Sequence, residues 1–476
     1  MSVNSNHQEN KKICCIGAGY VGGPSMTMIA YKCPNLTIEV VDIDEKRIEA
    51  WNSENLSNLP VYEPGLSDII KKVRHKNLFF STNVKEAIAS ADIIFLSVNT
   101  PTKIKGVGSG KASNLEYLER SVREIACYSK GHTIIVEKST VPVKTAETIK
   151  SILFSYLSKD SSNLKTYSII SNPEFLSEGS AIKDLESPDR VLIGGDDIEA
   201  VNQITDIYKK WVPVEKIIKT NLWSSELSKL AANAFLAQKV SSINSIGVIC
   251  EETGADINEV AKAIGSDSRI GQKFLNAGPG FGGSCFKKDI LSLVYICNFY
   301  RLDEIAKYWE NVINLNDWQQ DRISKLIIQK LFGTIQGKKI AIFGFAFKAN
   351  TNDTRESPAI KISRNLILEG AHLNIYDPKV NEEKIETELR HSLSSSVNKE
   401  FKSTWVKNNS IEDSVKDADA VVILTEWLEF SEIKWKHLVG LMRKPSWIFD
   451  TRNILNKKDL EDLDINIWIN GQDLKN

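Results

Sequence analysis

The first part of the chain alternates short apolar runs with longer stretches of helical spacing. The apolar runs cover residues 12–16, 37–41, 91–98, 133–138 and 166–170. Strands buried on both faces of a parallel sheet read as continuous apolar runs, and their crossover connections are helices. The pattern therefore predicts a doubly wound α/β domain.

The same rhythm restarts after Gln336–Gly337, with apolar runs at residues 338–347, 372–377 and 418–427. Between the two series, the stretch from Trp223 to about Cys250 lacks proline and has apolar residues at helical spacing. Such a helix is far longer than the average of about 11 residues, and it would connect domains or form a subunit interface.

We therefore expect an α/β protein with two Rossmann-like doubly wound domains joined by a long central helix. The expected division is residues 1–220 for a nucleotide-binding domain, 221–330 for a central helical domain, and 331–476 for the second Rossmann-like domain. The polar segment 381–409, with serines around His391–Ser396, is expected to be a surface insertion.

Composition narrows the class of protein. The 476 residues are 42% hydrophobic and 25% charged, which is typical of a globular protein. The net charge of -1 gives the chain no overall electrostatic attraction to nucleic acid or to an anionic membrane. The first ten residues are polar and no apolar run reaches about 18 residues, so we expect neither signal peptide nor membrane span. Seven scattered cysteines without zinc-ligand spacing predict no metal site and favour a cytoplasmic protein.

A glycine pattern follows the first apolar run. Gly17, Gly19 and Gly22 form GxGxxG directly after the run, a helix-like segment follows, and Asp42 ends the second run. In this arrangement the glycines bring the backbone and a helix N-terminus to a pyrophosphate, and the acid accepts hydrogen bonds from the ribose diol. Because Asp42 would repel a 2′-phosphate, the motif predicts NAD rather than NADP. Arg47 would either flank the adenosine or be a solvated helix residue.

Three further strand ends carry polar residues. The run at 91–98 leads into Asn99–Thr102, and the run at 133–138 leads into Ser139 and Thr140. Ligands of parallel α/β sheets bind beyond the carboxyl ends of the strands, although these hydroxyls could equally cap a strand stopped by proline. Glu174 follows the fifth run and could act as a general base, or could cap backbone amides in a turn.

The strongest chemical candidate is Cys285. It follows the glycine-rich loop Gly278–Gly283 and precedes Lys287, Lys288 and Asp289. Cations and a helix N-terminus favour the thiolate, which is the nucleophilic form, so the stretch reads as a loop that delivers a reactive cysteine. The alternative is a glycine-rich turn with a buried structural cysteine.

Two polar residues of the predicted long helix lie on one face. Lys229 and Asn233 are four residues apart, and their neighbours Ala232, Leu236 and Ala237 are small or apolar. A lysine among such neighbours is more often buried with a functional role than exposed to solvent. A solvated Lys229–Asn233 pair is the alternative.

The second Rossmann-like unit lacks the full glycine signature. Gly344 is present, but Ala346 and Ala349 stand at the second and third glycine positions. We therefore expect no second dinucleotide there. Lys348, Arg355 and Arg452 place cations near strand ends and suit phosphate or uronate-type anions.

Taken together, these residues resemble the UDP-glucose 6-dehydrogenase family of nucleotide-sugar dehydrogenases, over about Lys11 to Leu455. The resemblance to the animal-type branch rests on Lys11–Pro24, Phe79–Thr82, Glu137–Pro142 and Trp223–Lys229, and the catalytic signature is Gly282–Cys285 with Asp289. It departs at Gly278–Pro279, at Asn114, at Thr451, and over Asn52–Leu59.

The resemblance implies a four-electron oxidation of UDP-glucose to UDP-glucuronate, a glycosaminoglycan precursor, with two NAD reduced. Cys285 would form a thiohemiacetal and then a thioester. Lys229 and Asn233 would stabilise oxyanions, Asp289 would orient the lysine or the water, and Glu174 and Thr140 would move protons through water.

The resemblance also assigns binding residues and partners. The cofactor residues would be Gly17, Ala18, Gly19, Tyr20, Val21, Gly22, Asp42, Arg47, Val98, Asn99, Thr100, Pro101, Thr102, Ser139, Thr140, Glu178 and Arg355. The substrate residues would be Glu174, Phe175, Leu176, Glu178, Lys229, Asn233, Arg269 from a neighbouring subunit, Asn276, Phe281, Gly282, Phe347, Lys348 and Arg452. A homohexamer built as a trimer of dimers and inhibition by UDP-xylose are implied as well.

Two rival functions remain. One is a dehydrogenase for another nucleotide-sugar, such as GDP-mannose or UDP-N-acetylmannosamine, and the other is a non-catalytic NAD-responsive scaffold on the same fold. The close animal-type match argues against the first. The co-occurrence of Cys285, Lys229, Asp289, Glu174 and Asn233 argues against the second.

Overall fold

The structure is a computed structural model that describes residues 11–157, 165–390 and 404–472. Residues 391–403 of the expected surface insertion lie outside these residues. The expectation is wrong for its described flanks, because Glu382–Arg390 form a helix with buried residues and Trp405–Lys407 form a strand of the second sheet. The chain divides into two compact units, Met1–Ala232 with Leu291–Tyr300, and Asn233–Ile290 with Arg301–Asn476. Each unit is described by itself below. Among the described helices none is both long and apolar enough to cross a membrane.

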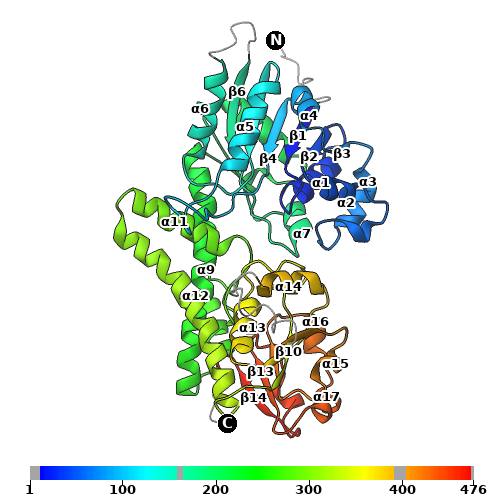
Figure 1. Cartoon of the computed structure of the whole chain (residues 1–476). Helices are drawn as coiled ribbons and strands as arrows, with labels where there is room; N and C mark the ends of the chain where they lie inside the picture. Colours follow the sequence, from blue (N-terminus) through cyan, green and yellow to red (C-terminus); the bar gives the residue numbers. More distant parts are fainter. Residues whose placement is uncertain (1–10, 158–164, 391–403, 473–476) are drawn as a thin grey trace. The chain divides into compact units, whose positions relative to one another are not determined.

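The first unit is built on an eight-stranded sheet of order β3-β2-β1-β4-β5-β6-β7-β8, parallel except where β7 pairs with β6 (Figure 1). Its strands are β1 Lys12–Ile16, β2 Thr37–Val41, β3 Leu78–Ser81, β4 Ile93–Leu96, β5 His132–Glu137, β6 Thr166–Ser171, β7 Val191–Gly195 and β8 Ile217–Thr220.

Helices cover both faces of this sheet, and β1 shows why its strands read as continuous apolar runs. Cys14 belongs to the hydrophobic cluster on one face and Cys15 to the cluster on the other, so the adjacent thiols point in opposite directions. The helices are α1 Gly22–Lys32, α2 Glu45–Asn52, α3 Leu66–Val73, α4 Val84–Ser90, α5 Glu116–Tyr128, α6 Thr145–Leu157, α7 Ala181–Glu186 and α8 Ile198–Tyr208, with 3-10 turns η1 Leu56–Asn58 and η2 Val214–Lys216.

The second unit contains a six-stranded parallel sheet of order β11-β10-β9-β12-β13-β14. The strands are β9 Lys339–Phe343, β10 His372–Tyr376, β11 Trp405–Lys407, β12 Ala420–Ile423, β13 Trp447–Asp450 and β14 Asn466–Ile469. The helices that lie wholly within this unit are α10 Ile257–Gly265, α12 Asp303–Lys330, α13 Pro358–Leu368, α14 Glu382–Arg390, α15 Ile411–Val415, α16 Leu428–Ser431 and α17 Trp435–Leu441, with the 3-10 turn η4 Lys457–Asp459.

Helix α9 (Leu222–Thr253) is the predicted long helix, and α11 (Phe286–Phe299) follows the glycine-rich loop. Both helices contribute residues to the two units. The α/β class, the two doubly wound sheets and the long helix are thus confirmed. The three-domain division at residues 220 and 330 stays a prediction.

The two sheets repeat the same hydrogen bond between a strand amide and an aspartate side chain. In the first unit the Asp92 carboxylate accepts from the Lys12 amide at 2.9 Å, at the start of β1. In the second, the Asp419 carboxylate accepts from the Lys339 amide at 2.9 Å, at the start of β9. The weak internal repeat in the sequence therefore corresponds to equivalent positions in the two sheets.

Candidate active site

The predicted cofactor loop of the first unit lies between β1 and α1. Gly17 has φ +108°, and a Cβ there would lie 2.5 Å from the Ser97 carbonyl oxygen, so glycine is required. By contrast, no described atom lies within 4 Å of the place where a Cβ of Gly19 would be. This backbone, with α1 beginning at Gly22, fits a dinucleotide pyrophosphate.

Asp42 ends β2 beside this loop, as predicted. Its carboxylate accepts from the Ala18 amide at 2.9 Å and pairs with the Arg47 guanidinium at 3.0 Å. Arg47 also pairs with Asp44 at 3.3 Å, and Asp44 caps the N-terminus of α2. Arg47 is therefore held beside the acid that would receive the adenosine ribose, which favours the cofactor interpretation of Arg47 over that of a solvated residue.

The two hydroxyl-rich strand ends lie together in the first unit. The Ser139 hydroxyl donates to the Val98 carbonyl at 2.6 Å, and the Thr100 hydroxyl donates to the Thr140 carbonyl at 2.7 Å. The predicted cofactor segments 98–102 and 139–140 are thus linked by their own side chains. Thr140 itself is half-buried.

Glu174 follows β6 and caps backbone amides, which is one of the two interpretations that the sequence left open. Its carboxylate accepts from the Phe175 and Leu176 amides at 2.8 and 3.1 Å, and pairs with the Lys138 ammonium at 2.8 Å. Burial alone would raise the pKa of Glu174, but Lys138 and the backbone donors together lower it. The Ser25 hydroxyl of α1 also donates to it at 3.2 Å.

Lys229 of α9 is buried, at 7% exposure, as its small and apolar neighbours predict. Its ammonium lies 5.1 Å from the centre of the Phe175 ring, and the Arg190 guanidinium lies 3.9 Å from the same ring. Phe175 is therefore a neutral platform for two cations in the first unit. Glu178, four residues further along the chain, is half-buried.

The glycine-rich loop belongs to the second unit and leads directly into α11. The Gly283 amide donates to the Arg355 carbonyl at 2.8 Å, and the Phe281 amide donates to the Asn316 side chain at 2.7 Å. Gly283 has φ +85°, and a Cβ there would lie 3.0 Å from the Phe347 ring. Cys285, half-buried, is thus presented at the N-terminal end of a helix, where the helix dipole favours a thiolate.

Asp289, in the first turn of α11, is fully buried. The Asn233 side-chain amide donates to one carboxylate oxygen at 2.6 Å, and the Lys288 ammonium pairs with the other at 2.7 Å. The structure therefore joins two of the predicted catalytic residues, Asn233 and Asp289, within one turn of Cys285.

The predicted anion-binding residues of the second unit surround the same loop. Arg452 donates to the Phe347 carbonyl at 3.0 Å, and a Cβ on Gly278 would lie 3.5 Å from its guanidinium. Lys348 lies 5.5 Å from the Phe347 ring centre. Small residues and cations at this end of the sheet fit a diphosphate.

Arg355 and Arg269 each pair with an aspartate two residues away, and Asn276 is exposed. Arg355 forms two parallel bonds to the buried Asp353, from Nε to Oδ1 at 2.9 Å and from Nη2 to Oδ2 at 2.6 Å. Arg269 is 87% exposed and pairs with Asp267 at 2.6 Å, and Asn276 is exposed. Action of Arg269 across a subunit contact stays a prediction.

The second sheet also has an acid after its second strand. Asp377, at the position equivalent to Asp42, is buried and accepts from the Phe345 and Ala346 amides and the Trp427 indole, at 2.7, 3.0 and 3.3 Å. Asp42 likewise accepts from protein donors, and the absence of a second dinucleotide from this unit stays a prediction.

Sequence reasoning missed several residues that hold these groups in place. Lys138 was assigned only to a strand, although a lysine that closes an apolar run beside polar strand ends is a usable signal. Glu63 accepts from the Gly179 and Ala181 amides at 2.8 and 3.0 Å, and so fixes the far end of the segment after Glu174. Nothing in the local sequence of Glu63 indicates this.

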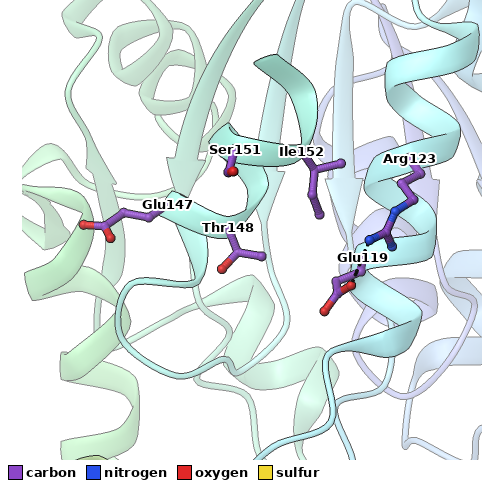
Figure 2. Close-up of a pocket in the computed structure, with 6 residues that line it drawn as sticks. All are labelled: Glu119, Arg123, Glu147, Thr148, Ser151 and Ile152. Carbon is purple, nitrogen blue, oxygen red and sulfur yellow. Dashed lines mark hydrogen bonds and ion pairs between the residues drawn. The ribbon is translucent and has the colours of Figure 1, made fainter. Parts of the chain in front are cut away.

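A surface hollow of about 480 Å³ lies away from these residues. Figure 2 shows that side chains of α5 and α6 line it, among them the ion pair of Arg123 and Glu119 at 3.1 Å and the side chains of Thr148 and Ile152. None of the predicted site residues lines this hollow.

Comparison with known proteins decides the family. Family models match along the chain: the UDP-glucose/GDP-mannose dehydrogenase family NAD binding domain at residues 11–212, the central domain at 223–318 and the UDP binding domain at 341–457. The chain is 54% identical to UDP-glucose 6-dehydrogenase of Mus musculus, over 94% of this chain and 90% of that protein.

The chain belongs to the UDP-glucose/GDP-mannose dehydrogenase family. It is also 51% identical to UDP-glucose 6-dehydrogenase 4 of Arabidopsis thaliana, over 97% of each protein. A solved UDP-glucose dehydrogenase from Pyrobaculum islandicum superimposes with a TM-score of 0.81 at 26% identity, covering 99% of this chain and 100% of that one. This dehydrogenase is therefore an NAD-dependent oxidoreductase. That the glycine loop, Asp42 and the linked strand ends bind its cofactor stays a prediction.

Proposed function

We propose that the chain oxidises UDP-glucose to UDP-glucuronate through covalent intermediates on Cys285. The observation that carries the proposal is the arrangement at the start of α11. There a half-buried thiol precedes the helix and the buried Asp289 binds both Asn233 and Lys288. The names of the relatives support UDP-glucose as the substrate.

In the proposed reaction the C6 alcohol first loses two electrons and becomes an aldehyde. The Cys285 thiolate adds to the aldehyde carbon, forming a C–S bond and an oxyanion that Lys229 and Asn233 stabilise. Loss of a second electron pair gives a thioester, and water then breaks the C–S bond to release the carboxylate and the thiol. Bound NAD supplies the oxidising power by accepting a hydride in each oxidation.

The remaining residues would prepare these steps. Asp289, which accepts from Asn233 and pairs with Lys288, would orient the lysine or the water. Glu174 and Thr140 handle protons through water, and the lowered pKa of Glu174 keeps its carboxylate ionised and able to accept a proton at neutral pH. Arg452, Lys348 and the loop from Asn276 to Gly282 bind the UDP moiety. Cation-rich ends of this sheet support that assignment.

The test is the ratio of NADH formed to UDP-glucose consumed. We expect two NADH per sugar and no released aldehyde, and mass spectrometry of the product should show UDP-glucuronate. Cys285→Ala should still bind UDP-glucose and lose acid formation. Cys285→Ser should be nearly as poor, because a hydroxyl is a far weaker nucleophile near neutral pH. Cys127→Ser, which changes an exposed cysteine, is the matched control.

A wild-type ratio of one, or undiminished glucuronate from Cys285→Ala, would remove Cys285 from the mechanism. Equal turnover of GDP-mannose or UDP-N-acetylmannosamine would broaden the substrate class. A cytoplasmic location belongs to the same proposal, because a reducing compartment keeps the Cys285 thiol free.

Self-association to a homohexamer, as a trimer of dimers, and feedback by UDP-xylose complete the proposal. UDP-xylose keeps the nucleotide and the sugar ring but lacks C6, so it can bind and cannot be oxidised. The segment around Thr140 would move in the response. Simple competition with no change in assembly or cooperativity would refute the regulatory part.

A further inference from the structure

Lys138, the residue directly after β5, carries a buried ammonium group. Its side chain is 3% exposed, and its Nζ lies 2.8 Å from Glu174 Oε2, 3.1 Å from the Tyr208 hydroxyl and 3.2 Å from Asn172 Oδ1. An ammonium group has three protons, so each proton faces an acceptor. A lysine this completely bound is part of a fixed network rather than a solvated cation.

The Glu174 carboxylate is equally well supplied with donors. One oxygen accepts from the Phe175 and Leu176 amides, and the other receives Lys138 and the Ser25 hydroxyl. A proton on either oxygen would displace one of these donors, so the network favours the ion.

The pKa values agree with this geometry. Burial acts to lower the pKa of Lys138, but Glu174 and Tyr208 raise it overall. Burial acts to raise the pKa of Glu174, but Lys138, the Phe175 amide and the more distant charge of Lys229 lower it overall. Both groups of the pair therefore stay charged at neutral pH.

The support for Lys138 is itself rigid. Its backbone amide donates to the Leu96 carbonyl of β4 at 3.0 Å. The Tyr208 hydroxyl of α8 donates to Asn172 Oδ1 at 2.7 Å, and the Asn172 amide donates to the Leu192 carbonyl of β7 at 2.8 Å. The position of the Lys138 ammonium is thus fixed through contacts with β4, β7 and α8.

From this network we propose that Lys138 is a positioning residue that holds the Glu174 carboxylate as an ion at one fixed place beside α1. The inference rests on the proposed function, in which Glu174 moves protons through water. It assigns to Lys138 no contact with the reacting atoms. Lys138 acts only through Glu174.

Replacing the cation separates charge from packing. Lys138→Met keeps a long side chain but leaves a mostly buried carboxylate facing neutral donors and the distant Lys229, so Glu174 should take up a proton at neutral pH. Lys138→Arg keeps the charge with a different donor geometry and should rescue part of the effect. Lys165→Met is the matched control, because the Lys165 ammonium donates to the backbone carbonyls of Ala126 and Cys127, at 2.8 and 3.1 Å.

The first measurement needs no activity. Infrared difference spectra at pH 7 should show a protonated carboxyl band in Lys138→Met that disappears in Lys138→Met/Glu174→Gln. The corresponding wild-type spectrum, taken against Glu174→Gln, should lack this band. Absence of the band in Lys138→Met would overturn the proposal. If Lys138→Met does not fold, recovery of the fold in the double variant supports the proposal and failure to recover counts against it.

The second measurement is the pH profile of kcat/KM for NADH formation. The acidic limb of the profile should shift to higher pH in Lys138→Met, so that activity at pH 6 is about tenfold below that of wild type. Lys138→Arg should show a smaller shift, and Lys165→Met should show none. A protonated Glu174 with an unchanged profile would overturn the positioning role. If wild type does not oxidise UDP-glucose, the proposed function fails, while the infrared test still decides whether Lys138 holds the charge of Glu174.

Discussion

At the scale of single residues, we predict that Asp42 determines the preference for NAD over NADP. Asp42→Asn should lower kcat/KM for NAD and raise it for NADP, because the ribose loses a charged acceptor and Arg47 is released to meet a 2′-phosphate. Charged hydrogen bonds contribute about 1.5–3 kcal/mol, so the NAD/NADP preference should fall roughly 10- to 100-fold.

Steady-state kinetics with both cofactors measures this change. Asp44→Asn is the matched control, since Asp44 also pairs with Arg47 but asparagine preserves its helix-capping role. An unchanged NAD/NADP preference in Asp42→Asn, or an equal change in Asp44→Asn, would show that Asp42 does not bind the ribose.

A second residue-level prediction concerns the buried acid Glu137. Burial raises its pKa well above the usual value, and the neighbouring Glu226 raises it further. A carboxyl group with a raised folded-state pKa is protonated in the folded protein after it has ionised in the unfolded chain. Its contribution to stability therefore falls as the pH rises from the unfolded pKa through the folded one.

Glu137→Gln removes this titration and can keep a hydrogen bond to Glu226. We expect its Tm relative to wild type to increase between pH 5 and pH 8, by roughly 2–4 °C for each kcal/mol gained. Thermal melts across this range measure it, with the exposed Glu147→Gln as the control. A difference in Tm that does not depend on pH would contradict the assignment.

At the scale of elements, α12 and the part of α9 that belongs to the second unit carry exposed apolar side chains. Phe235 is 59% exposed and packs edge-on against Trp309 with ring centres 5.6 Å apart, while Ile305 and Tyr308 are each 51% exposed. Exposed aromatic residues grouped in this way are typical of a protein interface. We infer that this face contributes to self-association.

Phe235→Glu should therefore shift the protein to smaller assemblies in sedimentation velocity, because a charge in an apolar contact must be desolvated. Val406→Glu, which changes an exposed apolar residue of β11, should leave the assembly intact. A fully active monomer of the wild-type chain would refute the oligomeric proposal altogether.

The elements also show how far sequence alone can reach. β1 and β2 begin and end where their apolar runs do, but β4 spans only Ile93–Leu96 of the run 91–98. Asp92, just before β4, binds the Lys12 amide with its side chain. Periodicity reports burial, and so it predicted both sheets and α9. It cannot report which distant partner a polar residue will meet.

The candidate site shows the same limit. The motif after β1 was readable because its chemistry is local, and Gly17 to Asp42 is a single βαβ stretch. The environment of Glu174 was not readable, since it depends on Lys138, on Ser25 and on a hydroxyl at Tyr208, which are far apart in the sequence. The structure shows Glu174 capping backbone amides, whereas its role as a general base stays a prediction.

At the scale of the whole molecule, the chain consists of two compact units with different predicted ligands. NAD alone should slow amide hydrogen exchange in the first unit, around Gly17–Gly22 and Asp42, and UDP alone should slow it in the second, around Phe281 and Arg452. At ligand concentrations of 100 times Kd, the stabilisation of a binding unit is about 2.7 kcal/mol. Mass-resolved exchange measures both patterns, and UDP protection of the Gly17 loop equal to that by NAD would contradict this division.

The matched carboxylate bonds of Asp92 and Asp419 mark equivalent positions in the two sheets. In each unit an aspartate side chain binds the amide at the start of a strand, β1 or β9, so the same tie holds both strands. The units differ in the glycine loop, which is complete at Gly17–Gly22 and reduced to Gly344 with Ala346 in the second unit. The same scaffold can therefore be kept while the loop at the strand end, which is predicted to select the ligand, changes.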